Sequence, residues 1–320
     1  MNTLLVIGGT GFFGKSILDA FARGLLDPWQ IKKIIVMSRN ANRLLEEAPQ
    51  LVSVNVELYP ANIASAETLP FADYVIHAAA STDIRDYLSR PNQEKSNIEA
   101  STSNYCSLAR NFHKNSKIVY VSSGAVYGVQ PDNVEHVTEG MSFFSTESMD
   151  AGKRDYAIGK IAAENAIRDL ASEGFSLSIA RCFAFVGCWL PRQQHFAIGN
   201  FIEDVLYGRS VVVKAKHRVY RSYMYADDLV EWLMTIAEHS SEKCPIYNVG
   251  SDQPILMGEL AYLVAELRHT DAEVPDIADP RVDRYIPSIH KAESELNLRI
   301  RYNLVDAIKL SISKIKSLSL

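Results

Sequence analysis

Short apolar runs alternate with longer stretches of helical spacing through the first half of the chain, and this alternation constrains the fold most. The runs are rich in Val and Ile and lie at residues 4–7, 33–37, 52–58, 74–77, 118–121 and 177–181. Residues 12–25, 93–112 and 156–170 repeat apolar positions with the period of an amphipathic helix. Continuously apolar strands joined by helices indicate a parallel sheet covered on both faces. The sequence therefore predicts an α/β fold with a doubly wound parallel sheet.

The second half is less regular. Residues 52–58 alternate apolar and polar side chains, which favours a place near a sheet edge. After about Gly187, polar loops separate helical patches at residues 199–206, 227–238, 257–267 and 304–315. We therefore predict a dinucleotide-binding domain over residues 1–186 and a smaller, mixed substrate-binding part over residues 187–320. The boundary is open, because residues 221–250 could pack back on the first domain.

Composition excludes several classes of protein. Of the 320 residues, 47% are hydrophobic and 22% charged, as in an average globular protein, which excludes disordered and coiled-coil chains. A net charge of −5 predicts no general affinity for nucleic acid. No apolar run reaches the roughly 18 residues of a membrane span, and no signal peptide is visible. Four scattered cysteines favour neither a disulfide framework nor a metal site, so we expect a cytoplasmic protein.

The first apolar run leads directly into a glycine-rich loop and then into a helix. Its three spaced glycines permit a tight turn, a close approach of backbone N–H groups to a pyrophosphate, and close packing of helix on strand. The helix N-terminus would then meet the phosphate charge with its dipole. The sequence predicts a dinucleotide site that includes Gly8, Thr10, Gly11, Phe12, Phe13 and Gly14.

The tip of the second strand indicates which dinucleotide is bound. A carboxylate at this tip usually binds the free ribose 2′-hydroxyl of NAD. Here the tip carries Ser38 and Arg39 instead. A guanidinium suits a 2′-phosphate through charge-assisted hydrogen bonds. We therefore predict NADP as the cofactor, with NAD as the alternative if Arg39 is only a solvated surface residue.

A tyrosine, a lysine and a serine form the candidate catalytic set. Tyr156 and Lys160 are four residues apart, so a helix places the phenol and the ammonium on one face. The cation should lower the pKa of the phenol from its ordinary value of about 10. The strand at 118–121 runs into Ser122 and Ser123, which brings two hydroxyls to the carboxyl edge of the sheet. One of them could hydrogen-bond a substrate oxygen beside Tyr156.

Together these residues resemble the extended short-chain dehydrogenase/reductase family, in particular its nucleotide-sugar epimerase, dehydratase and reductase branch. The resemblance covers nearly the whole chain. Besides the glycine loop and the Tyr-Lys pair, it rests on ordered matches at residues 77–80, Asn97, residues 123–128, 181–187, 221–228 and 247–250.

The resemblance implies a role for each matching residue. Tyr156 would be the acid/base, Lys160 would tune it and hold the nicotinamide ribose, and Ser123 would polarise the substrate oxygen, with Ser122 as its less favoured neighbour. The substrate nucleotide would lie near Asn200 and Arg221. His77 would line the cofactor pocket or be a buried core histidine. The remaining cofactor-binding residues would be Asn62, Ile63, Ala78, Ala79 and Ala80, together with Tyr156 and Lys160.

Departures from the family pattern reduce the number of reactions that the resemblance allows. Sugar 4,6-dehydratases carry an Asp-Glu pair where this chain has Gly124 and Ala125, neither of which can move a proton. Ala125 also replaces the Cys of members that epimerise through an enediol, and Ala184 replaces a substrate-contacting Asn. His195 is either a second acid/base or a solvated loop residue.

The remaining chemistry is hydride transfer at one carbon. We therefore predict an NADPH-dependent reductase of a nucleotide-activated 4-keto-(6-deoxy) sugar. The alternative is an NAD(P)-dependent nucleotide-sugar 4-epimerase. A non-catalytic NADP-sensing scaffold is disfavoured, because Ser123, Tyr156 and Lys160 are all present.

Two helices also bear on the oligomeric state. Residues 93–112 and 156–170 resemble the helices that pair across a two-fold axis in this family and form a four-helix bundle. Both carry more apolar positions than one sheet face requires. We predict a homodimer, the alternative being that these positions only cover the sheet: Ile98, Tyr105, Leu108, Phe112, Ile158, Ile161, Ala162 and Ile167.

Overall fold

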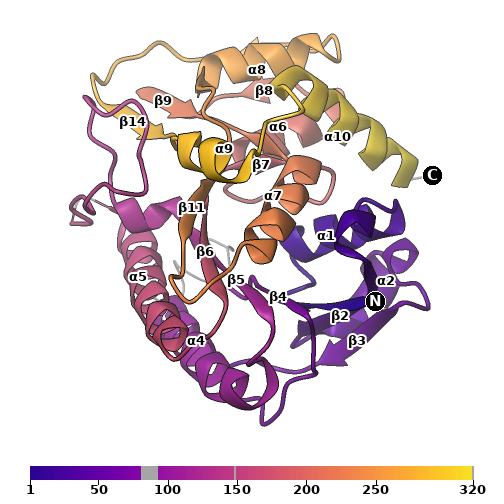
Figure 1. Ribbon diagram of the computed structural model, residues 1–320. Helices are drawn as coiled ribbons and strands as arrows, with labels where there is room; N and C mark the ends of the chain where they lie inside the picture. The colour runs from indigo at the N-terminus through magenta and orange to yellow at the C-terminus, as the bar shows by residue number, and fades with distance from the viewer. Residues whose placement is uncertain (81–92, 148, 319–320) are drawn as a thin grey trace.

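A seven-stranded parallel sheet forms the centre of the computed structural model, which describes residues 1–80, 93–147 and 149–318 (Figure 1). Its strand order is β11-β6-β5-β4-β1-β2-β3, the order of a Rossmann fold extended by one strand. The predicted doubly wound sheet is therefore confirmed, and the alternating strand does lie at an edge. The strands are β1 (Asn2–Ile7), β2 (Ile31–Ser38), β3 (Val56–Pro60), β4 (Tyr74–His77), β5 (Lys117–Ser123), β6 (Leu177–Cys182) and β11 (Ile246–Val249).

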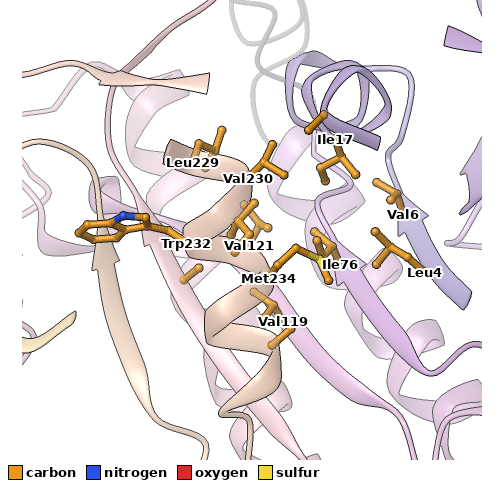
Figure 2. Close-up of a cluster of buried hydrophobic side chains, with 14 of the residues drawn as sticks. Leu4, Val6, Ile17, Ile76, Val119, Val121, Leu229, Val230, Trp232 and Met234 are labelled. Carbon is orange, nitrogen blue, oxygen red and sulfur yellow. The ribbon is translucent and has the colours of Figure 1, made fainter. Parts of the chain in front are cut away.

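Helices cover both faces of this sheet, because successive strand residues point to opposite sides. Leu4 and Val6 of β1 pack on one side, and Leu5 and Ile7 pack on the other. The first side holds α1 (Phe12–Ala22) and α7 (Ala226–Glu238), and the second holds α4 (Gln93–Phe112) and α5 (Ala151–Ser172). Figure 2 shows side chains of α7 meeting those of the strands, among them Leu229, Val230, Met234, Ile76, Val119 and Val121.

The C-terminal part consists of short strands and helices at the carboxyl edge of the sheet (Figure 1). Its strands pair as three small sheets: β7 (Phe185–Val186) with β10 (Met224–Tyr225), β8 (Val211–Val212) with β13 (Ala272–Glu273), and β9 (Arg218–Arg221) with β12 (Ile255–Leu256) and β14 (Val282–Tyr285). Its helices are α6 (Ala197–Leu206), α8 (Met257–Glu266), α9 (His290–Leu296) and α10 (Leu304–Leu318). The first half adds the short α2 (Leu44–Glu47) and the 3₁₀ turns η1 (Asp27–Trp29), η2 (Ala41–Arg43), η3 (Pro49–Leu51) and η4 (Gly124–Tyr127).

Some element bounds differ from the predicted ones, for local reasons. The first helix ends at Ala22, because a turn with Gly24 at positive φ follows it. β3 begins only at Val56, since residues 49–51 form a 3₁₀ turn and the Val54 side chain is exposed. From residues 221–250, α7 packs on the main sheet and β11 becomes its seventh strand. The division into two domains remains a prediction.

The expected dimer helices, α4 and α5, pack against each other and against the sheet. The core of this chain buries the side chains of Ile98, Tyr105 and Ile167, so these three are not available to a partner. Leu108 and Ile161 are only half-buried. The structure thus accounts for part of the surplus apolar surface without a partner, and the homodimer remains a prediction. Among the described residues, no helix has the length and apolar character to span a membrane.

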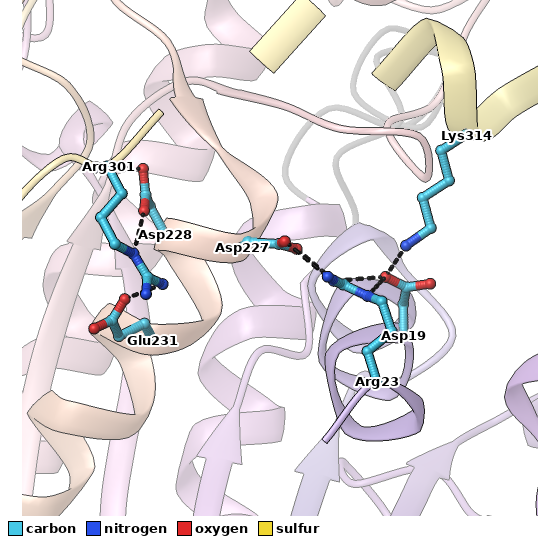
Figure 3. Close-up of polar contacts among 7 residues, drawn as sticks. All are labelled: Asp19, Arg23, Asp227, Asp228, Glu231, Arg301 and Lys314. Carbon is cyan, nitrogen blue, oxygen red and sulfur yellow. Dashed lines mark hydrogen bonds and ion pairs between the residues drawn. The ribbon is translucent and has the colours of Figure 1, made fainter. Parts of the chain in front are cut away.

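Ion pairs attach the C-terminal segments to the nucleotide-binding half (Figure 3). Lys314 of α10 pairs with Asp19 of α1, and Arg23, directly after α1, pairs with Asp227 at 2.6 Å. At a second point, the carboxylate of Asp228 accepts hydrogen bonds from the backbone N–H groups of Arg301 and Tyr302, both at 3.2 Å. The chain that leads into α10 is therefore held by a carboxylate at the start of α7.

Replacing Asp228 with Ala should destabilise the fold by about 2–4 kcal/mol, because it leaves two backbone N–H groups without their acceptor. The Asp228 side chain is 0% exposed, so no water can replace it. Glu231 is the matched control, since it also pairs with Arg301 but is 34% exposed. Glu231→Ala should cost about 1 kcal/mol or less. Urea unfolding of both variants checks this, and equal losses would contradict it.

Candidate active site

The glycine loop between β1 and α1 has the shape that a dinucleotide requires. Gly8 has φ +87°, and a Cβ on it would lie 2.7 Å from the carbonyl oxygen of Ala78. A Cβ on Gly14 would lie 2.1 Å from the carbonyl oxygen of Gly9, so α1 and the loop pack too closely for any side chain at position 14. No side chain caps the N-terminus of α1 at Gly11. Its free N–H groups and its dipole therefore suit a pyrophosphate, and the loop fits the predicted cofactor. Phe12 and Phe13 begin α1, where both rings pack near Phe185.

A cationic cavity of about 230 Å³ lies at the tip of β2. Thr10 of the glycine loop and Ser38 both line it and hydrogen-bond each other, with 2.9 Å between the two hydroxyl oxygens. Arg39 and Arg43 both line it, and sequence reasoning missed Arg43 because η2 gave no pattern. The carboxylate in the lining, Glu47, is bound by Lys15 at 3.0 Å and by Arg43. Burial alone would raise the pKa of Glu47, but these cations outweigh it and lower that pKa. Glu47 is therefore ionised and already paired.

The other residues predicted to bind the cofactor lie along the same sheet edge. Ala78, Ala79 and Ala80 follow β4, and the first two border the loop at Gly8. Asn62 follows β3 and accepts a hydrogen bond from the N–H of Ala64. Ile63 is buried in the core beneath it. The structure thus places Ala78 and Ala79 beside the loop, while cofactor contacts of Asn62, Ile63 and Ala80 remain a prediction.

The predicted catalytic trio is brought together at the end of β5. Ser123 is the last residue of this strand, and its hydroxyl hydrogen-bonds the phenol of Tyr156. Lys160 lies one turn further along α5 and is buried. Its Nζ donates to the carbonyl oxygen of Val121 at 2.8 Å and to the hydroxyl of Tyr120 at 3.3 Å. The Tyr156 ring centre is 5.9 Å from that Nζ.

The acid/base properties of the trio differ from the expectation drawn from its spacing. Burial raises the pKa of Tyr156 above its ordinary value, and the bond from Ser123 opposes this only in part. Burial also lowers the pKa of Lys160, to about 8. The expected lowering of the phenol pKa was therefore wrong for this arrangement, because burial of the phenol raises its pKa and the nearby charge of Tyr285 adds to that rise. Tyr156 is a protonated phenol at neutral pH, which is the form of a proton donor.

A second tyrosine reaches the trio from the C-terminal part, and sequence reasoning missed it. The Tyr285 hydroxyl of β14 lies 3.3 Å from the Ser123 hydroxyl. The Tyr285 ring packs against the Phe183 ring, with 4.7 Å between the two ring centres. These two rings explain Gly124. A Cβ there would lie 2.6 Å from Phe183 Cζ and 2.8 Å from the Tyr285 hydroxyl. The site has no room for the acidic side chain that a dehydratase carries at this position.

Introducing that acid, as Gly124→Asp, should destabilise the protein by about 2–3 kcal/mol, because rigid rings must move to admit it. We expect no gain of dehydratase activity. Gly140 is the matched control, since a Cβ there meets nothing within 4 Å, and Gly140→Asp should be nearly neutral. Thermal unfolding compares the two variants. An equally stable Gly124→Asp protein would contradict the packing argument.

The structure does not bring Ser122 to the site. Its hydroxyl points to the opposite face of β5 from Ser123 and donates to Glu164 at 2.6 Å. Glu164 pairs in turn with Arg181 at 2.7 Å, and both of these side chains are buried. His77 is also a core residue, between the rings of Tyr105 and Tyr120. Burial lowers its pKa to about 3, so its ring is neutral.

The predicted substrate-binding residues occupy the C-terminal part. Arg221 of β9 pairs with Asp283 at 2.7 Å, and its register partner is Tyr285. Asn200 of α6 donates to the carbonyl oxygen of Gln194, while its own buried amide oxygen has no partner among the described residues. His195 is exposed, with its ring 4.0 Å from that of Phe196. Across the described ranges, no three His, Cys, Asp or Glu side chains cluster as metal ligands.

The fold and this site define a dinucleotide-binding enzyme of the extended short-chain dehydrogenase/reductase type. The chain belongs to the NAD dependent epimerase/dehydratase family, whose profile matches residues 4–250. This confirms the predicted family and the prediction of an enzyme.

Individual relatives are distant. UDP-glucuronic acid decarboxylase 6 of Arabidopsis thaliana is 26% identical over 96% of this chain and 87% of its own length. UDP-glucuronate 4-epimerase 6 of the same plant is 26% identical over 67% of this chain and 48% of its own length. Among solved structures, a Thermus thermophilus UDP-glucose 4-epimerase complex with NAD has a TM-score of 0.79 and 21% identity, covering 98% of this chain and 99% of that one. This likeness concerns the fold.

Proposed function

We propose that this protein is an NADPH-dependent reductase of a nucleotide-activated 4-keto-(6-deoxy) sugar. The observation that carries the proposal is the cavity at the tip of β2. It offers the Ser38 hydroxyl and the guanidinium groups of Arg39 and Arg43, and its carboxylate is already neutralised by Lys15 and Arg43. Such a cavity suits a 2′-phosphate better than a 2′-hydroxyl. NADPH is the cofactor that cells hold in reduced form for net reductions.

The residues of the site then have distinct roles in the reaction. The loop amides and the N-terminus of α1 bind the pyrophosphate, and Lys160 holds the nicotinamide ribose. When bound, the reduced nicotinamide supplies a hydride to the keto carbon. Ser123 hydrogen-bonds the keto oxygen and orients it toward Tyr156. Tyr156 gives its phenolic proton to that oxygen, so the carbonyl gains one hydride and one proton and becomes an alcohol.

Two features of the site support reduction in particular. The pKa of Tyr156 is raised by burial, so its phenol carries the proton that reduction requires at neutral pH. The packing of Phe183 and Tyr285 against Gly124 leaves no acid for dehydration. The amide oxygen of Asn200, which has no partner among the described residues, and the guanidinium of Arg221 support a nucleotide-sugar substrate, as do the UDP-sugar names of the relatives.

A nucleotide-sugar 4-epimerase is the second candidate. It is favoured by the UDP-glucuronate 4-epimerase among the relatives and by the fold of solved UDP-glucose 4-epimerases. Tyr156, Lys160 and Ser123 serve both reactions. The difference lies in the cofactor, which an epimerase keeps bound and regenerates in each turnover.

Net consumption of cofactor separates the two candidates. Purified protein mixed with a nucleotide-activated 4-keto-6-deoxyhexose should oxidise NADPH in proportion to the sugar reduced. No such consumption, combined with interconversion of 4-hydroxy epimers, would support the epimerase instead.

We also propose a homodimer that uses the half-buried apolar residues of α4 and α5. Sedimentation at micromolar concentration tests it, and a monomer alone would contradict it. A cytoplasmic location remains a prediction.

A further inference from the structure

The ammonium of Lys160 is held by β5 and not by its neighbour Tyr156. The Lys160 side chain extends from α5 to β5 and is only 2% exposed. Its Nζ donates to the Val121 carbonyl oxygen at 2.8 Å and to the Tyr120 hydroxyl at 3.3 Å. The same Nζ lies 4.8 Å from the Tyr120 ring centre and 5.9 Å from that of Tyr156. Of these two tyrosine rings, that of Tyr120 is therefore the nearer to the ammonium.

The Tyr120 hydroxyl is fixed in place by the protein core. Tyr120 is fully buried in the layer between β5 and the helices α4 and α5. Its hydroxyl also shares a hydrogen bond with Thr102 of α4, which is equally buried. A phenolic oxygen has two lone pairs, so both contacts can exist together. An apolar Phe at this strand position would fill the same core volume without any of these bonds.

We propose that Tyr120, oriented by Thr102, is a positioning residue that fixes the Lys160 ammonium at the end of β5 and so sets the pH range in which Lys160 stays charged. This inference rests on the proposed acid/base role of the Tyr156–Lys160 pair. It holds for reduction and for epimerisation alike.

Other titratable groups around Lys160 also affect its pKa. Glu94 from α4, Glu164 from α5 and Cys182 from β6 act to raise its pKa, while burial lowers it to about 8. His77 from β4 is neutral, and Tyr156 is protonated. A hydrogen bond accepted from the ammonium favours the charged form. Losing the Tyr120 hydroxyl should therefore lower the pKa of Lys160 further.

A double-mutant cycle on the cofactor-free protein tests the contact itself. Tyr120→Phe should lower the Tm at pH 7, and it should lower it clearly less when Lys160 is already Met. The bond to Thr102 is lost in both backgrounds, so it cancels from the comparison. Equal losses in the two backgrounds would overturn the proposal, whatever reaction the enzyme performs.

The pH profile tests the consequence for catalysis. Activity that needs the ammonium is constant below the pKa of Lys160 and falls above it. In Tyr120→Phe the basic limb of the kcat/KM profile should move to lower pH by about one unit. The pH dependence of NADPH binding, followed by nicotinamide fluorescence, should shift in the same direction. Tyr105→Phe is the control, since Tyr105 is also fully buried but its hydroxyl contacts His113 at 3.4 Å.

Each outcome of these measurements decides something. A shifted limb in Tyr120→Phe, with an unshifted limb in Tyr105→Phe, supports the positioning role. Unshifted limbs in both variants would overturn it. If only the keto-sugar assay fails, the result counts against the reductase. The double-mutant cycle on the cofactor-free protein would still test the contact between Tyr120 and Lys160.

Discussion

Replacing Tyr156 with Phe should lower kcat by about 10²- to 10⁴-fold, the usual contribution of a positioned general acid. The substitution keeps the ring that packs in the core between α5 and the sheet and removes only the hydroxyl that bonds Ser123. Folding and NADPH binding should therefore change little. Initial rates with a nucleotide-activated keto sugar, together with a fluorescence titration of NADPH, separate the loss of chemistry from a loss of binding.

Tyr285→Phe is the matched control for this result. Its hydroxyl also lies beside Ser123, at 3.3 Å, and its ring is held by Phe183. Since we assign no proton transfer to Tyr285, losing one neutral hydrogen bond should cost roughly tenfold or less. A larger loss in Tyr285→Phe than in Tyr156→Phe would reverse the assignment of the proton donor.

Ser38→Asp should invert the cofactor preference. A carboxylate at the tip of β2 repels a 2′-phosphate and offers the 2′-hydroxyl of NADH an acceptor. Arg39→Ala should weaken NADPH binding by roughly ten- to hundred-fold, since one charge-assisted bond is lost, and leave NADH nearly unchanged. Arg43→Ala should act in the same direction but less, because Arg43 is already paired with Glu47.

Binding of both cofactors is titrated at two salt concentrations, since exposed charge pairs are screened by salt. Arg268→Ala removes the same charge from an exposed position after α8 and serves as the control. Equal affinity of the unmodified protein for NADH and NADPH would contradict the role of the β2 tip and favour the epimerase.

The first half of the fold was predictable because its signals are local. Each strand from β1 to β6 is a continuous or alternating apolar run, and the glycine loop follows directly on β1. Spacing also placed Tyr156 and Lys160 on one face of α5. Spacing gave no information on the direction of the Lys160 ammonium, which bonds Val121 and Tyr120. Spacing also does not show how deeply the phenol is buried, and burial raises the pKa of Tyr156, so the shift of that pKa was predicted with the wrong sign.

The missed residues depend on contacts between distant segments. Tyr285 is 162 positions from Ser123, and it reaches the site through the pairing of β9 with β14, each only four residues long. Strands this short have no period to recognise. Arg43 lies on a 3₁₀ turn and faces the β2 tip only because η2 folds back there. Ser122 was included since neighbouring strand residues look equivalent until their faces are known.

Deuterium transfer from labelled cofactor tests the central claim most directly. The protein is given NADPH that carries deuterium on the transferred position of the nicotinamide, together with a nucleotide-activated 4-keto-6-deoxy sugar. We expect a 4-hydroxy product with one deuterium at carbon 4 for each NADPH consumed, detected by mass spectrometry and NMR. Unreduced keto sugar and intact NADPH, together with deuterium-free epimerisation of a 4-hydroxy nucleotide sugar supplied in a parallel reaction, would contradict the reductase.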